Sequence, residues 1–411
     1  MPPKLFLKKW FFVFTIIIFN FILALRTSIK FFHFFFWFLV SYVALSFVWL
    51  LIEYFSVKLS FERRIIGRIQ EGDNLDIKAI IKNDSFFPLF NSVLLDSLTC
   101  AGPDEREYRV LIDYLGPKSI LSEEYNCLCL QRGRYQLGPF FIYIFDPWGI
   151  FFLKKAYFIY SELFVYPQTF NIQKFPRLTG GAAPWFGIET GRISGDEHEF
   201  YGVREYKYGD SIKRIHWLST ARQNKLIIKE FQKQAFFRAV IVFNLNKDDN
   251  FGQQKDNVAE YTIKIVASVA KYLIEKDISL EIIAHVGEIV RIPFNKGPEH
   301  LEDIMKFLTI AQAESKVRLD EIFMEFSKYI PNDSTLILVI LDKDWEYLPA
   351  ILSSDKKNIS IIPLVLMSSS FLYHLQEKKD TKKVLIKFMQ EFNLRPLLFT
   401  YGQDLEEAFK H

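Results

Sequence analysis

The sequence predicts three parts in order: a pair of transmembrane helices, an antiparallel β-sandwich and an α/β domain. Three observations predict them. Long uncharged apolar runs stand at the N-terminus, short alternating runs separated by turn residues follow, and strand-like and helix-like stretches then alternate to the end of the chain. We expect a helical hairpin, the sandwich, a motif-bearing segment and the α/β domain over residues 1–57, 58–170, 171–235 and 236–411.

The composition limits the classes of partner. Half of the 411 residues are hydrophobic and 43 are Phe, and the excess lies at the start of the chain, which marks a segment in lipid. The net charge of +3 gives no electrostatic case for nucleic acid. The three cysteines predict no disulfide framework and a reducing compartment. Cys127 and Cys129 are interpreted as small buried residues on one face of a strand, since zinc usually takes four ligands.

Two apolar runs predict the membrane hairpin. Residues 31–52 meet the length of about 20 residues that crossing a bilayer requires. Residues 10–25 form a shorter run, and no small-x-small cleavage site of a signal peptide follows it. Only residues 26–30 separate the runs, so both ends of the hairpin lie on the same side of the membrane.

The flanking charges orient this hairpin. Basic residues precede and follow it more densely than they occur in its turn. They are Lys4, Lys8 and Lys9 before it, Lys58, Arg63, Arg64 and Arg68 after it, and Arg26 and Lys30 in the turn. The positive-inside rule therefore predicts a multi-pass protein of the inner (cytoplasmic) membrane with its soluble domains in the cytoplasm.

The next region is predicted to be an antiparallel β-sandwich. Alternating runs fall at 74–83, 91–98, 107–115 and 120–131, and Gly, Asn, Asp and Pro residues separate them. Nothing in this composition points to chemistry, so we expect a binding or spacing role.

The most informative stretch spans residues 187–234. A charged, Gly-rich loop leads to a turn at 208–210, and Asp210 is placed to cap a helix over residues 211–222. Gln223 and Asn224 end that helix, and a strand begins near Leu226.

The order of residues in this stretch forms a long pattern. Its members are Gly195, Asp196, Glu199, Phe200, Arg204, Tyr206, Gly209, Asp210, Arg214, Ile215, Trp217, Ala221, Arg222, Leu226, Lys229 and Phe231. With the N-terminal helices and the β-rich segment before it, this pattern resembles the bacterial family known as domain of unknown function 58. His216 stands where that family usually has Asp.

This resemblance implies a von Willebrand factor type A-like domain after the motif. It also implies association with MoxR-type AAA+ ATPases and with other membrane proteins, but it names no reaction. The signature residues that we expect to bind a partner are Arg204, Tyr206, Gly209, Asp210, Arg214, Trp217 and Arg222.

The C-terminal region supports an α/β fold independently. Buried strands are predicted at 238–245, 334–341 and 359–366, a covering helix at 256–276, and a hairpin formed by 279–286 and 288–294. Strands that alternate with helices indicate a mostly parallel sheet, in which ligands gather at the carboxyl ends of the strands.

A type A domain would carry a metal there on a D-x-S-x-S motif. This chain has instead Asn244, Asn246 and Asp248, with Lys247 among them, and Asp342 at the end of a later strand. Hard divalent ions prefer several anionic oxygens. The sequence leaves a bound Mg²⁺ open, but it favours a degenerate site, a polar loop that retains only the shape. We expect no cofactor.

The densest group of titratable residues in the sequence could be interpreted as a catalytic cluster. Its members are Asp196, Glu197, His198, Glu199, Asp210 and His216. Their spacing fits no metal motif, and the chain has no G-x-x-x-x-G-K-[ST] phosphate loop, so we expect no enzymatic activity.

These observations favour a membrane-anchored adaptor that works with a cytoplasmic MoxR-type ATPase in the assembly or remodelling of membrane or envelope complexes. Two alternatives stay open: a metal-dependent hydrolase that uses His198 and His216, and a sensor that binds envelope components through the sandwich.

Overall fold

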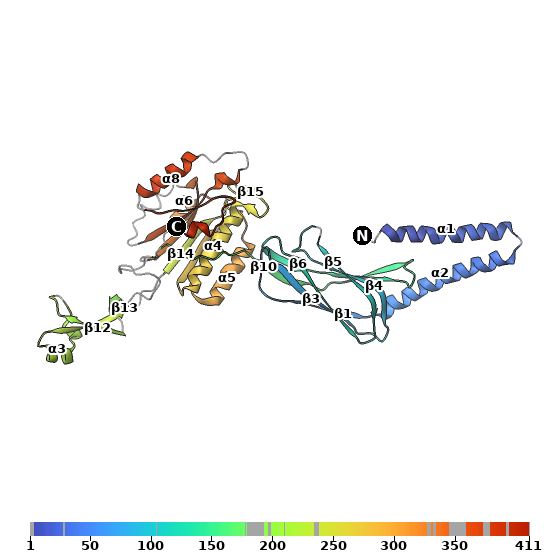
Figure 1. The fold of residues 1–411 in the computed structure, drawn as a ribbon, viewed down its shortest axis with the longest axis horizontal. Coiled ribbons are helices and arrows are strands. Elements are labelled where there is room, and N and C mark those ends of the chain that lie inside the picture. The colour runs from blue at the N-terminus through green and yellow to red at the C-terminus, as the bar shows by residue number, and fades with distance from the viewer. Residues whose placement is uncertain are drawn as a thin grey trace. The chain divides into compact units, whose positions relative to one another are not determined.

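The structure, a computed structural model, divides the chain into two compact units, Met1–Tyr166 and Pro167–His411 (Figure 1). It describes residues 4–27, 29–103, 105–176, 178, 193–195, 199–208, 210–233, 238–326, 330–331, 334–344, 359–372, 379–391 and 394–410. Each unit is considered by itself.

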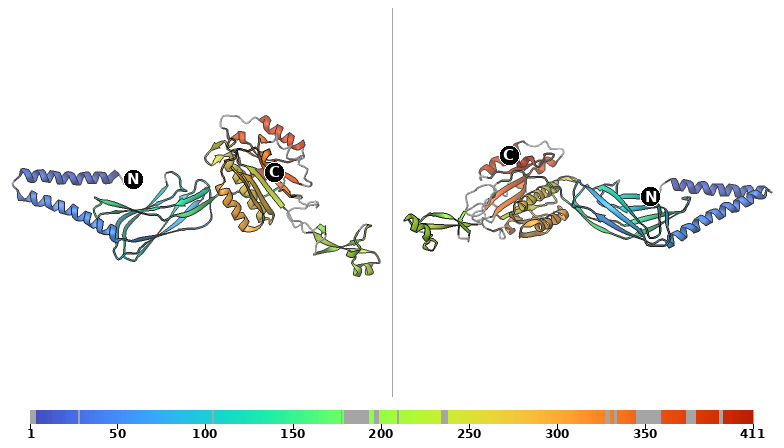
Figure 2. Two further views of the ribbon diagram at one scale, coloured as in Figure 1. Left: turned by 180° about the vertical axis from the view of Figure 1, so that it is seen from behind. Right: turned by 60° about the horizontal axis from the view of Figure 1, so that its bottom comes forward.

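Two helices open the first unit. They are α1 (Lys4–Arg26) and α2 (Lys30–Ser56), which form a hairpin (Figure 2). The rings of Phe21 and Phe36 pack between them at 5.1 Å. By length and composition α2 can cross a membrane: its mean hydropathy reaches 2.3 over 18 residues, of which 11% are buried. The described apolar part of α1, Phe11–Arg26, is shorter.

The rest of the first unit is a β-sandwich. Its strands are β1 (Leu59–Ile65), β2 (Ile69–Gln70), β3 (Asn74–Asn83), β4 (Leu89–Ser97), β5 (Glu107–Leu115), β6 (Ile120–Leu128), β7 (Gly133–Leu137), β8 (Phe140–Phe145), β9 (Phe152–Tyr157) and β10 (Ser161–Tyr166). They form sheets in the orders β1-β3-β6, β2-β10-β7 and β5-β4-β8-β9, antiparallel except for the β2–β10 pair. Alternating buried and exposed residues along β3 put every second side chain into the core.

The sandwich shares one of its cores with α2. Leu50 of α2 packs with Ile81 of β3, Leu94 of β4 and Ile142 of β8, and all four side chains are buried. Glu53, also buried, accepts a hydrogen bond from the Phe90 backbone N–H. The C-terminal turns of α2 are therefore part of the sandwich fold.

The second unit contains a six-stranded sheet in the order β18-β17-β14-β19-β20-β21. Its strands are β14 (Arg238–Asn244), β17 (Ser279–His285), β18 (Ile289–Asn295), β19 (Thr335–Leu341), β20 (Ser360–Leu366) and β21 (Leu397–Phe399). All pairs are parallel except β17–β18, the predicted hairpin. A small ribbon of β15 (Gly252–Gln253) and β16 (Asp256–Asn257) precedes the first long helix.

Helices cover both faces of this sheet (Figure 2). They are α4 (Val258–Glu275), α5 (Gly297–Ile310), α6 (Leu319–Phe326) and α8 (Lys379–Glu391), with short 3₁₀ turns η3 (Ser368–Phe371) and η4 (Glu407–Phe409). Leu319 and Ile322 of α6 share a core cluster with Leu385 and Met389 of α8, on one face. Asn257 caps α4 by accepting a hydrogen bond from the Glu260 backbone N–H at 2.9 Å.

The signature residues form a small module of their own, which we call the signature module. It consists of β11 (Ile193–Gly195), β12 (Glu199–Glu205), η1 (Ile212–Arg214), α3 (Trp217–Gln223) and β13 (Ile227–Lys233), with the strand order β11-β13-β12. The prediction of a single helix over 211–222 was wrong. Ile215 is extended and pairs with Ile228, which interrupts the helix, so α3 begins only at Trp217.

Candidate functional site

Arg204 and Asp210 fasten the turn of the signature module. The two Nη atoms of Arg204 donate to the two carboxylate oxygens of Asp210 at 2.6 and 2.8 Å. The backbone N–H of Lys207 also donates to Asp210, at 2.8 Å. Arg204 is the main cause that lowers the pKa of Asp210 to about 2. Asp210 therefore stays ionised and holds the loop against β12, and it does not cap α3 as the sequence predicted.

His216 takes the capping role instead. Its Nδ1 lies 2.7 Å from the Ser219 hydroxyl and accepts a hydrogen bond from the Ser219 backbone N–H at 3.3 Å. The His216 backbone N–H donates to Ile227 at 2.8 Å, which joins the start of α3 to β13. The Nδ1 atom of His216 therefore caps the N-terminus of α3. His198, its partner in the hydrolase hypothesis, and Gly209 of the signature lie outside the described residues.

The apolar residues of the signature module behave differently from its ion pair. Trp217 and Leu218 are 67% and 62% exposed, and Ile212 is 69% exposed on the neighbouring turn. Ile215 and Ile227, by contrast, are buried and form the module's small interior. The three exposed apolar residues Ile212, Trp217 and Leu218 are called the signature surface below.

The remaining signature residues frame this surface. Tyr206 is half-buried and its backbone N–H donates to Leu226 at 2.9 Å, which extends the β12–β13 pairing. Arg214 is half-buried on η1, and Arg222 is exposed in the last turn of α3. The structure therefore gathers the described signature residues into one module but gives them two roles: Arg204 and Asp210 hold its turn, and Trp217 lies on its surface.

A cavity of about 270 Å³ lies in the second unit, at the carboxyl ends of β14 and β19. The chain enters the sheet at β14, adds β17 on one side and β19 on the other, so the strand order reverses between β14 and β19. Ligands bind at such switch points in open α/β sheets. The polar residues that line it are Asn244, Asn246, Asp249, Arg318, Lys343 and Asp344.

The predicted degenerate site lies at the polar side of this cavity, where its amide groups are partly engaged. The Nδ2 atoms of Asn244 and Asn246 both donate to Val317, at 2.9 and 3.4 Å. Asp249, the buried carboxylate of the cavity, pairs with the ammonium group of Lys343. The Lys343 ammonium thus neutralises the Asp249 carboxylate, whereas the Oδ1 atom of Asn244 is buried without a hydrogen-bond partner in the described part of the chain.

Two of the predicted ligands lie apart from this cavity. Asp342 is buried and accepts hydrogen bonds from the backbone N–H and hydroxyl groups of both Ser368 and Ser369, so it caps η3. Asp248 is exposed, and its backbone N–H donates to Asn246. Sequence reasoning missed Asp249 and Asp344, since the loops after β14 and β19 give no sign of which carboxylates turn inward.

Asp344 should make the stability of the second unit depend on pH. Burial raises the pKa of its carboxyl from 3.8 to about 6. The folded protein then holds a proton that the unfolded chain releases, so stability is full below about pH 4 and declines as the pH rises to about 6. We expect Asp344→Asn, which keeps an acceptor for the Leu341 backbone N–H, to remove this decline and to raise the free energy of unfolding at pH 7.5 by about 1–2 kcal/mol.

Denaturant unfolding of the full chain between pH 4 and 7.5 measures this effect. Asp248→Asn changes an exposed carboxylate of the neighbouring loop in the same way and serves as the control. Equal pH slopes for the two variants and the wild type would show that Asp344 titrates normally.

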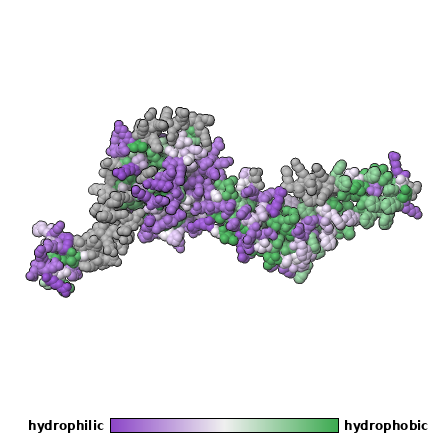
Figure 3. Space-filling model, viewed as in Figure 1, coloured by the Kyte–Doolittle hydropathy of each residue, from purple (hydrophilic) through white to green (hydrophobic). Residues whose placement is uncertain are grey.

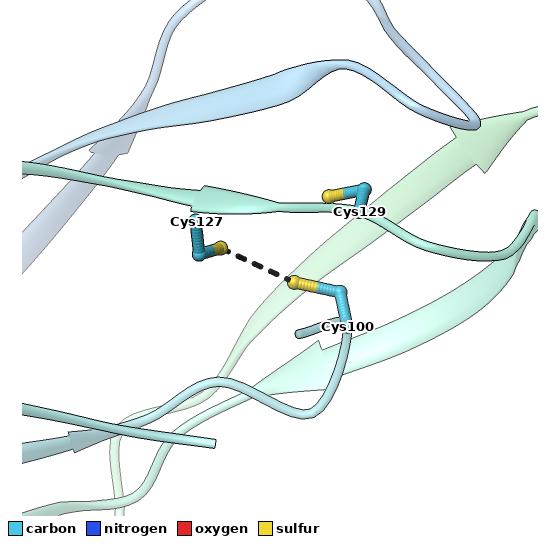
Figure 4. A group of neighbouring side chains, drawn as sticks. All are labelled: Cys100, Cys127 and Cys129. Carbon is cyan, nitrogen blue, oxygen red and sulfur yellow. Dashed lines mark hydrogen bonds between the residues drawn. The ribbon is translucent and has the colours of Figure 1, made fainter. Parts of the chain in front are cut away.

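A second cluster lies inside the β-sandwich, where Cys100, Cys127 and Cys129 meet (Figure 4). All three are buried, and their sulfur atoms lie within 4.8 Å of one another. Hydrogen bonds from Cys127 and Cys129 lower the pKa of the Cys100 thiol. The sequence predicted that Cys127 and Cys129 share a face, but the approach of Cys100, which follows β4, is a tertiary contact that spacing does not show.

A family match begins inside the signature module and continues into the six-stranded sheet. Residues 202–364 match the family model described as protein of unknown function DUF58. The uncharacterized protein YeaD of Bacillus subtilis (strain 168) is 23% identical over 266 residues, covering 60% of this chain and 61% of that protein. The chain thus aligns with less than two thirds of this relative. Residues 202–364 are therefore assigned to the DUF58 family, whose function is unknown.

Solved structures resemble short stretches of the chain. The CARDB domain of a Pyrococcus furiosus protein, in complex with di-metal ions, covers 24% of this chain and 90% of its own, with 12% identity and a TM-score of 0.18. A Bordetella pertussis protein assigned as ApaA covers 26% and 93%, with 14% identity and a TM-score of 0.19. Likenesses at these scores carry no argument about function.

Proposed function

We propose that this protein is a non-enzymatic, membrane-anchored adaptor that works with a cytoplasmic MoxR-type AAA+ ATPase in the assembly or remodelling of membrane or envelope complexes. The observation that carries the proposal is the division within the signature module. Its charged residues Arg204 and Asp210 satisfy each other, while Ile212, Trp217 and Leu218 are left on the surface. Such a surface favours protein binding over chemistry.

In this proposal both N-terminal helices span the membrane as a hairpin. Support comes from α2, whose first half exposes Phe31, Phe34 and Trp37 by more than 60% each. In the view of Figure 3, hydrophobic residues gather over α1 and α2, whereas the face of the second unit is mostly hydrophilic. Lys58, Arg64 and Arg68 follow the hairpin, so the positive-inside rule still favours a cytoplasmic sandwich and α/β domain.

The contacts between α2 and the sandwich support a membrane boundary close to the fold. The Trp148 ring packs on Tyr42 at 5.4 Å, and the Phe151 ring packs on Phe47 at 5.3 Å. Aromatic rings are enriched where the hydrocarbon meets water. The loop that carries Trp148 therefore lies against the middle of α2.

The α/β part of the proposal is a von Willebrand factor A-like domain over residues 236–411. The parallel sheet with one antiparallel edge strand and helices on both faces supports it. So does the cavity at the switch point between β14 and β19. In this chain the Lys343–Asp249 pair would replace the metal of such a domain, so we propose that partner binding does not require Mg²⁺.

Co-purification of the tagged full-length protein from detergent tests this function. We expect an AAA+ ATPase of the MoxR type among the retained proteins, and Trp217→Ala to weaken its binding by about 30-fold or more, as loss of a central aromatic contact does. Because Trp217 is exposed, the thermal stability of the variant should equal that of the wild type.

Phe158→Ala is the matched control, since it removes an aromatic side chain of similar exposure from the first unit. Consistent absence of any AAA+ ATPase from the wild-type preparation would reject the partner class. Equal retention by the Trp217→Ala and Phe158→Ala variants would reject the signature surface as the contact.

A further inference from the structure

We propose that Cys100, Cys127 and Cys129 form a binding site for a single soft metal ion, and that monovalent copper is the ion that fits it. The three sulfurs converge from two parts of the sandwich. Cys127 lies in β6 and Cys129 directly follows it, while Cys100 lies in the turn after β4 (Figure 4). Cys100 and Cys127 approach to 3.8 Å between their sulfur atoms.

These separations suit coordination by three thiolates. A metal–thiolate bond of about 2.3 Å places three ligands of a trigonal site about 4.0 Å apart. The observed sulfurs lie within 4.8 Å of one another, and those of Cys100 and Cys127 are 3.8 Å apart. Closing the site around an ion therefore takes sulfur movements of less than about 1 Å, which side-chain rotation supplies.

The ligand set decides which ion fits. Within the described part of the chain, the cluster gathers sulfur atoms alone, with no fourth His, Asp or Glu ligand. The oxygens of Asp96, a nearby buried carboxylate, are already engaged by Arg63 and by the Tyr125 hydroxyl. Zinc in structural sites takes four ligands, and calcium and magnesium take oxygens, whereas soft thiolates select monovalent copper.

The surroundings keep such a site dry. Apolar side chains pack around the sulfurs, among them Leu75, Leu98 and Leu137, each of which is at most 1% exposed. The turn with Cys100 lies near the surface, where the neighbouring Thr99 is exposed. Movement of that turn gives an ion its route to the sulfurs.

A disulfide explains the cluster less well. It would join two sulfurs at about 2.05 Å and leave the third without a role. The predicted reducing compartment also opposes it. Coordination of one ion uses all three thiols and releases their protons as the bonds form, with no change of oxidation state.

Titration of the reduced full-length protein with monovalent copper, in detergent and without oxygen, tests the site. The chain has only these three cysteines, so any copper–thiolate absorption belongs to them. We expect a single ion per chain that withstands a competing chelator, and X-ray absorption that shows three sulfur neighbours at about 2.3 Å. Cys100→Ala should lower the apparent affinity by at least about 10-fold.

Thr99→Ala is the control on the same turn, since it removes only a hydroxyl that bonds to the Gln136 carbonyl. The control for the site itself is a triple variant, Cys100→Ala, Cys127→Ala, Cys129→Ala. If the wild type binds copper no more strongly than this variant, the proposal is overturned. Oxygen or nitrogen neighbours around the metal would also overturn it. The same holds if Zn²⁺ binds to the site as strongly as monovalent copper does. The wild-type absorption measurement decides the matter even where a variant folds poorly.

Discussion

Arg63→Met should lower the free energy of unfolding of the first unit by about 3–5 kcal/mol. The Arg63 side chain is fully buried and pairs through two nitrogens with Asp96, itself 1% exposed. It also donates to the Leu137 carbonyl at 3.2 Å and to the Ser161 hydroxyl at 3.1 Å. Methionine fills similar volume but leaves the Asp96 charge buried without its partner, which is the costly outcome.

The neighbouring residue provides the control for this prediction. Arg64 lies on the same strand and pairs with Glu62, but both side chains are more than half exposed. Arg64→Met should therefore change stability by less than about 1 kcal/mol. A double Arg63→Met, Asp96→Leu variant should regain most of the loss, because it removes both charges together. Equal melting of the Arg63→Met and Arg64→Met proteins would show that the buried pair contributes little.

Leu50→Ala should destabilise the sandwich by about 2–5 kcal/mol even though Leu50 lies in the apolar N-terminal region. The side chain is fully buried in the core that α2 shares with β3, β4 and β8. Truncation leaves a cavity among residues that a strand scaffold holds in place, so collapse around it is limited.

Leu45→Ala makes the same change on the exposed side of α2, where the side chain is 71% exposed, and should leave the sandwich unaffected. The melting temperature of both variants is measured in detergent, with proteolysis of the sandwich as the readout of unfolding. Similar melting temperatures for Leu50→Ala and Leu45→Ala would mean that α2 and the sandwich fold independently.

Local periodicity predicted many elements of the fold closely. The alternating run at 74–83 is β3, the run at 238–245 contains β14, and the apolar helix pattern at 256–276 contains α4. These signals are local, since each depends only on which face of one element is buried. The predicted hairpin at 279–294 also formed, because Gly287 supplies the positive φ that its turn requires.

Contacts between distant segments could not be predicted in this way. Nothing near Arg63 in the sequence shows that its charge is buried, and it was predicted only as one of the basic residues that follow the hairpin. Asp342 ends its strand as expected, but Ser368 and Ser369, which occupy its carboxylate, lie after the next strand. The meeting of Cys100 with Cys127 and the burial of Asp249 are likewise consequences of packing.

The burial of Leu50 and Glu53 in the sandwich has a mechanical consequence. The last turns of α2 cannot twist or lean without carrying the sandwich with them, since the side chains that fix them belong to its core. With α2 in a bilayer, as proposed, a change in bilayer thickness that tilts the helix would swing the sandwich by a similar angle. The anchor would then act as a lever, able to convey force between the lipid and the rest of the protein.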